Sequence, residues 1–103
     1  MKDTVTGTVE GTGSAINISV GFVPSYVKVQ NIDSATIESM EWWNNMPDAN
    51  AIKRAGTSSP AFSKLTSNGI SPYDVATAAD GFTIGADADV NASAETIVWL
   101  AVR

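Results

Sequence analysis

The chain has 103 residues, of which 44% are hydrophobic and 17% are charged, and no apolar run is long enough to cross a bilayer. Its net charge is −5 and its six basic residues are scattered, so we expect neither a nucleic-acid nor a membrane partner. It has no Cys and no His, which excludes disulfides, thiolate and histidine catalysis, and metal sites built from these side chains.

The N-terminal segment, residues 1–14, is rich in Thr and Gly and lacks the apolar stretch of a secretory signal, so we expect folding in a cytoplasm. Val5 and Val9 would share one face of a strand. We expect either a weak edge strand or a flexible arm that becomes ordered on contact with a partner. Residues 15–103 are expected to form a single β-sandwich domain.

Two short segments with alternating apolar and polar residues follow. Residues 15–20 and 26–30 both have the pattern of a half-buried strand, and turn-forming residues separate them. In the second segment, Val27 and Val29 share one face, and Tyr26 lies with polar residues on the other. Both segments are predicted to pack their aliphatic face on a common core.

The next segment, Glu38–Asn44, contains two adjacent tryptophans. As a strand it places Met40 and Trp42 on one face and Trp43 on the other, beside Glu41. The face with Trp42 is the better core candidate. An exposed indole at Trp43 would indicate a contact surface.

A short helix over residues 34–43 is the alternative for this segment. Ile37, Met40 and Trp43 would then share one face at three-residue spacing, and Trp42 would point outward. We favour the strand because turn signals are dense on both sides of the segment.

Turn-forming residues recur through the rest of the chain. Residues 47–80 are rich in them, and we expect a long irregular region there. Short strands at intervals of about 8–12 residues predict an all-β fold, a single antiparallel β-sandwich that is jelly-roll-like or a small barrel.

The C-terminal segment, Thr96–Val102, is apolar on both faces of a strand. One face consists of Ile97, Trp99 and Ala101, and the other of Val98, Leu100 and Val102. A strand of this kind is covered on both sides, so we expect either a loop of the same chain or another chain over the second face.

Several polar patterns resemble sites for chemistry. Asp87, Asp89 and Asn91 match the first half of a calcium loop, but Ala92 and Val98 stand where that loop needs Gly and Glu. We expect these side chains to cap backbone N–H groups instead.

Two pairs of charged residues could also form sites for chemistry. Lys53 and Arg54 could bind an anion, although pairing with nearby acidic residues is the commoner outcome. Glu38 and Glu41 could serve glycoside hydrolysis, but no pattern places them across a cleft. We therefore expect no enzymatic activity, no cofactor and no metal.

Four segments in this order carry a resemblance that spans nearly the whole chain after residue 15. They are "GFVPSYVKVQN" (21–31), "EWWNNM" (41–46), "SNGISPYD" (67–74) and "DGFTIGADADVNASAETIVWLAVR" (80–103). Together they resemble a family of small tailed-bacteriophage virion proteins. The residues that match positions defining the family's fold are Gly21, Phe22, Pro24, Asn31, Gly81, Phe82, Gly85 and Asn91, whereas the double Trp departs from its pattern.

The resemblance implies a β-sandwich protein on the outside of the virion, most plausibly a capsid decoration (cement) protein. Such proteins form symmetric homo-oligomers, often trimers, and clamp neighbouring copies of the major capsid protein. A tail-fibre or baseplate module that contacts host-surface glycan is the alternative. We expect subunit or capsid contacts at Trp43, Tyr73, Val98, Leu100 and Val102, with residues 4–12 as a tether.

Overall fold

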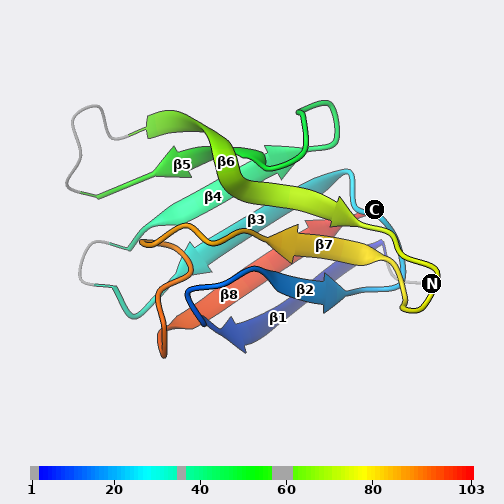
Figure 1. Ribbon diagram of the computed structural model, residues 1–103, viewed down its shortest axis with the longest axis horizontal. Coiled ribbons are helices and arrows are strands. Elements are labelled where there is room, and N and C mark those ends of the chain that lie inside the picture. The colour runs from blue at the N-terminus through cyan, green and yellow to red at the C-terminus, as the bar shows by residue number, and fades with distance from the viewer. Residues whose placement is uncertain (1–2, 35–36, 57–61) are drawn as a thin grey trace.

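The computed structural model describes residues 3–34, 37–56 and 62–103, and these residues form eight β-strands and no helix. The strands are β1 (Thr4–Glu10), β2 (Ile16–Ser19), β3 (Tyr26–Asn31), β4 (Ser39–Trp43), β5 (Asn50–Arg54), β6 (Phe62–Tyr73), β7 (Gly81–Ile84) and β8 (Thr96–Val102). They form one antiparallel sheet in the order β1-β8-β3-β4-β5-β6-β7-β2 (Figure 1). The all-β fold predicted from the turn spacing is confirmed.

The sheet curls into a half-barrel with two layers. The first half of β6 pairs with β5, and its last four residues pair with β7, so the chain passes from one layer to the other within this strand. A shift of register between Asn50 and Ala51 marks a β-bulge where the sheet bends. Figure 1 shows β2, β7 and the end of β6 in front of β3 and β8. We call β1, β8, β3, β4 and β5 the large layer and β6, β7 and β2 the small layer.

The core lies between the inner faces of these layers. Its fully or almost fully buried members are Val27, Val29, Met40, Trp42, Ala51, Ile70, Phe82, Ile84, Val90, Ile97 and Ala101. The rings of Phe82 in β7 and Trp99 in β8 meet edge to face across the two layers, with centroids 5.4 Å apart. The aliphatic faces predicted for residues 15–20 and 26–30 both contribute to this core.

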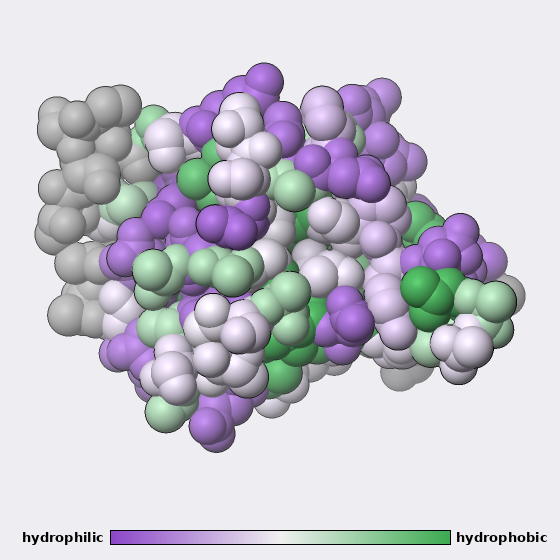
Figure 2. All heavy atoms as spheres, viewed as in Figure 1, coloured by the Kyte–Doolittle hydropathy of each residue, from purple (hydrophilic) through white to green (hydrophobic). Residues whose placement is uncertain are grey.

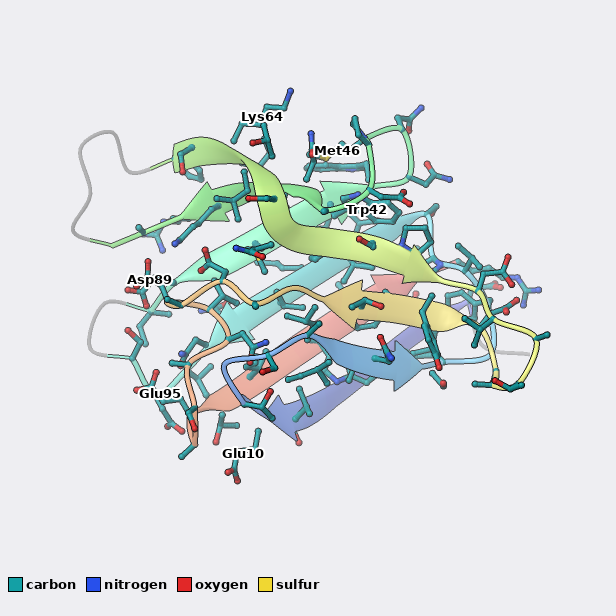
Figure 3. All side chains as sticks on the ribbon, in the orientation of Figure 1. Glu10, Trp42, Met46, Lys64, Asp89 and Glu95 are labelled. Carbon is teal, nitrogen blue, oxygen red and sulfur yellow. The ribbon has the colours of Figure 1, made fainter. Side chains whose placement is uncertain are left out.

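The two adjacent tryptophans lie on opposite faces of β4. The side chain of Trp42 is 2% exposed and its Nε1 donates a hydrogen bond to the Pro47 carbonyl at 3.4 Å, whereas Trp43 is 43% exposed. Figure 3 shows Trp42 and Met46 close together beside the β4–β5 turn. The strand is confirmed over Ser39–Trp43, and the helical alternative is wrong there.

The N-terminal segment forms an edge strand rather than an arm. β1 pairs with β8 along its whole length, so this edge strand belongs to the same sheet as the strands of residues 15–103. Gly7 lies opposite Trp99, and a Cβ atom at Gly7 would come within 2.5 Å of the Trp99 ring. Glycine at this position lets the indole spread across the inner face of β1.

The region 47–80 is more regular than the turn signals predicted, because β5 and the 12-residue β6 lie within it. Most residues in the first half of β6 are exposed, so this strand has no apolar alternation by which it could be recognised. Its order comes from backbone pairing with β5 and β7. Residues 57–61 of the predicted irregular region lie outside the described residues.

Candidate functional site: the outer face of the large layer

The outer face of the large layer carries a group of apolar side chains. We call it the outer patch and define it as Tyr26, Trp43, Val98, Leu100 and Val102. In β8 these residues alternate with core residues of the inner face, and in β3 and β4 they alternate with buried Val and Trp side chains. Four of the five predicted contact residues therefore share one surface.

Strand register determines the arrangement of the patch. Three rows of outward residues cross β4, β3 and β8, namely Trp43, Tyr26 and Val102 in the first, Glu41, Lys28 and Leu100 in the second, and Ser39, Gln30 and Val98 in the third. The first row is apolar throughout. The second places one cation and one anion directly opposite each other between apolar neighbours. The result is an apolar strip with a short polar border, the usual composition of a protein contact surface.

Tyr26 and Trp43 form the aromatic centre of the patch. Their ring centroids are 5.2 Å apart and the rings are tilted by 56°. The Tyr26 hydroxyl donates a 2.6 Å hydrogen bond to the Glu41 carboxylate. Because this bond and the cross-strand contact hold both rings in place, a partner that binds here immobilises little further side-chain freedom.

The pKa of Tyr26 reflects its contact with Glu41. Burial, the hydrogen bond to Glu41 and the charge of Glu41 together raise the pKa of Tyr26 to about 12. We expect Glu41→Gln, in a Tyr73→Phe background that leaves one tyrosine, to lower this pKa towards 10, because the charge is lost. Ultraviolet absorbance titration of tyrosinate measures it. An unchanged pKa in the Glu41→Gln chain would contradict the contact.

Tyr73 does not belong to the outer patch. It ends β6 opposite Gly81, and it alternates with Ile70, which is fully buried. Tyr73 therefore lies on the outer face of the small layer, on the other side of the molecule. Figure 2 shows that side, where hydrophilic and hydrophobic residues are intermixed. The structure therefore separates Tyr73 from the other four predicted contact residues, and the contact predicted at Tyr73 stays a prediction.

Tyr26 is the patch residue that sequence reasoning missed. Alternation placed it on the face opposite Val27, together with polar residues, and that placement is correct. Its contact with Trp43 depends on the pairing of β3 with β4, which no local pattern indicates.

The segment that matches the first half of a calcium loop forms ion pairs with the side-chain ammonium group of Lys53. Lys53 Nζ lies 3.0 Å from Asp87 Oδ2 and 2.6 Å from Asp89 Oδ2. Asp87 Oδ2 also accepts the backbone N–H groups of Asp89 and Val90, the turn capping that the sequence predicted. Among the described residues, no group of three or more His, Cys, Asp or Glu side chains could hold a metal ion.

Lys53 is held in its charged form by these two carboxylates. Burial lowers the pKa of Lys53, but the hydrogen bonds and charges of Asp89 and Asp87 outweigh it, so the pKa lies above its ordinary value. The prediction that the base at this position pairs with acidic residues is confirmed for Lys53.

The third residue of the motif, Asn91, serves the fold. Its buried amide donates to the carbonyls of Ser14 and Gly85 and accepts the N–H of Thr12. These bonds join the β1–β2 connection to the segment after β7. A buried amide whose N–H groups and oxygen are all hydrogen-bonded to the backbone fixes the positions of these loops.

The described residues form no pocket, and they contain no helix long and apolar enough to span a membrane. Glu41 lies on the outer face, bonded to Tyr26, whereas Glu38 is buried just before β4. No protein-family model, curated protein or solved structure matches the chain.

Proposed function

We propose that this protein is a non-catalytic structural component of a tailed-bacteriophage virion, a capsid decoration protein. It binds the major capsid protein on the outer surface of the shell as a symmetric homo-oligomer and stabilises the shell. The observation that carries the proposal is the outer patch. Three neighbouring strands present apolar side chains there, and no described strand lies over them.

The outer patch combines apolar residues with one large exposed aromatic side chain, Trp43, which can serve as the central contact of a binding surface. Trp43 is 43% exposed, whereas Trp42 at the preceding position of the same strand is 2% exposed. Trp and Tyr dominate the free energy of many protein contacts because they bury a large area with few rotatable bonds. Lys28 and Glu41 border the anchor with opposite charges. These contacts suit a partner surface that is apolar at its centre.

Oligomerisation multiplies the effect of each patch. Several patches on one assembly bind a repetitive lattice with an apparent affinity well above that of one patch. The resemblance to virion proteins favours a trimer. The net charge of −5 favours solubility of a protein made in many copies.

Particle binding tests the proposal. Purified protein is added to particles that lack it, and bound protein is measured by co-sedimentation. We expect hundreds of copies per particle, and at least a tenfold loss of affinity for Trp43→Ala because the central anchor is removed. Tyr73→Ala, an aromatic truncation on the opposite face, is the matched control and should bind as well as the unchanged protein. Equal binding by Trp43→Ala and the unchanged protein would refute the role of the patch.

The tail-fibre or baseplate alternative rests on the same aromatic pair. An exposed indole beside Tyr26, with the Glu41 carboxylate next to it, offers a flat surface on which a sugar ring can stack. A protein of that class would be present in a few copies per particle. It would also bind host polysaccharide in the absence of capsid.

A further inference from the structure

Among the described residues, the strand β1 has one unpaired edge. It stands at one end of the strand order and pairs with β8 alone in that part of the chain, and in Figure 1 it is the outermost strand at the lower side. The Asp3 carbonyl accepts the N–H of Arg103, and the N–H of Gly11 donates to the Glu95 carbonyl. Bonding alternates along an antiparallel pair, so the odd-numbered residues of β1 bond to β8.

The even-numbered residues of β1 therefore direct their backbone groups to the free edge. These are Thr4, Thr6, Thr8 and Glu10, and their side chains are exposed on the outer face. Few of the devices that commonly protect an edge strand occur in β1, which has no Pro, no Lys and no bulge against β8, and whose one charged residue, Glu10, lies at its end. Such an edge is open to pairing with another strand.

The sequence of β1 is symmetric, which favours pairing of this edge with β1 of a second copy of the chain. Residues Val5–Val9 read V-T-G-T-V, the same in both directions. In an antiparallel pair of two copies centred on Gly7, Thr6 lies opposite Thr8 of the second copy, and Val5 lies opposite Val9 of the second copy. The edge-facing backbone groups are in register for hydrogen bonds, and Thr–Thr and Val–Val neighbours are favourable across strands.

The charge and the burial of the β1 residues also favour the antiparallel register centred on Gly7. Glu10 lies opposite Thr4 of the second copy, so no like charges face each other. Val5 and Val9 are half-buried on the inner face of β1, beside the open side of the half-barrel. Pairing places two further valines beside them and removes more of their apolar surface from water.

We propose that two copies of the chain associate through β1, antiparallel and about a two-fold axis at Gly7. The two large layers then form one continuous sheet. An axis perpendicular to that sheet keeps both outer patches on the same side, where they can bind a lattice together. This last consequence rests on the proposed function, whereas the pairing itself does not. The contact is two-fold, unlike the trimer that the resemblance implies.

Light scattering and sedimentation equilibrium of the full chain test the pairing. We expect a mass twice the 10.7 kDa of one chain. In the double variant Thr6→Lys with Thr8→Lys, each Lys would face a Lys of the second copy, and the mass should fall twofold. Thr6→Glu with Thr8→Glu should behave likewise. An equimolar mixture of the two variants should recover the dimer, because each Lys then faces a Glu.

The recovery in the mixture separates pairing from folding, since variants that fail to fold would not restore a dimer. Circular dichroism checks that each variant keeps its sheet. A monomeric or trimeric unchanged chain, or lysine and glutamate variants that both remain dimeric, would overturn the proposal. So would a mixture that stays monomeric. Loss of particle binding in a chain that still dimerises would refute the proposed function and leave the pairing intact.

Discussion

Replacing Trp42 with Ala is expected to lower the free energy of unfolding by about 3–5 kcal/mol, the range for large aromatic residues truncated in a packed core. Trp42 is 2% exposed and belongs to the cluster between the two layers, so its removal leaves a cavity that the sheet cannot close. For a domain with roughly 5–15 kcal/mol of total stability, this loss is large. Urea unfolding followed by far-ultraviolet circular dichroism measures it.

Trp43→Ala is the matched control, because it removes the same side chain from the next position of the same strand. Its contact with Tyr26 is partly exposed, so we expect a loss of about 1 kcal/mol or less. Trp42→Phe should fold and lose less than Trp42→Ala. Equal losses for the two Ala variants would contradict the opposite orientation of the two indoles.

Lys53→Met is expected to lower the free energy of unfolding by about 3 kcal/mol, because it leaves the nearly buried Asp87 carboxylate without its counter-charge. The side chains of Lys53 and Asp87 are only 12% and 11% exposed, so water cannot replace the lost partner fully. The neighbouring base Arg54 is exposed, and Arg54→Met should change stability by less than about 0.5 kcal/mol. Denaturant unfolding of both variants at neutral pH compares them.

Adding Asp87→Asn to Lys53→Met should recover part of the loss, because the unpaired charge is removed. No recovery in this double variant would show that the loss has a different cause, such as packing of the lysine stem.

Alkaline pH weakens the same interaction. Because the pKa of Lys53 is raised above 10.5 in the folded protein, the folded chain binds more protons than the unfolded chain above that pH, and stability falls as pH rises. Tyr26 acts in the same direction between about 10 and 12, since its folded pKa is also raised. The alkaline loss should therefore become shallower in the Lys53→Met chain without disappearing.

Local alternation predicted those elements whose two faces differ in polarity. Residues 26–30 and 96–102 lie in strands with the expected inward and outward residues. Trp42 and Trp43 lie on opposite faces of β4, as neighbouring residues of a strand do. β6 was missed because exposed polar residues occupy most of its first half, and its order comes from pairing with two other strands. A sequence pattern within one segment does not show which other strand that segment pairs with.

The candidate site divides in the same way. Alternation along a strand is enough to predict that Trp43, Val98, Leu100 and Val102 lie on the faces opposite Trp42 and Ile97. Which of these outward residues contact one another depends on how the strands pair. The β3 pairings with β4 and β8 bring Tyr26 between Trp43 and Val102, the bend of β6 carries Tyr73 to the opposite side, and Lys53 reaches carboxylates 34 and 36 residues away. Strand order and register arise from the packing of the whole chain. They place outward side chains that are distant in the sequence next to one another on one surface.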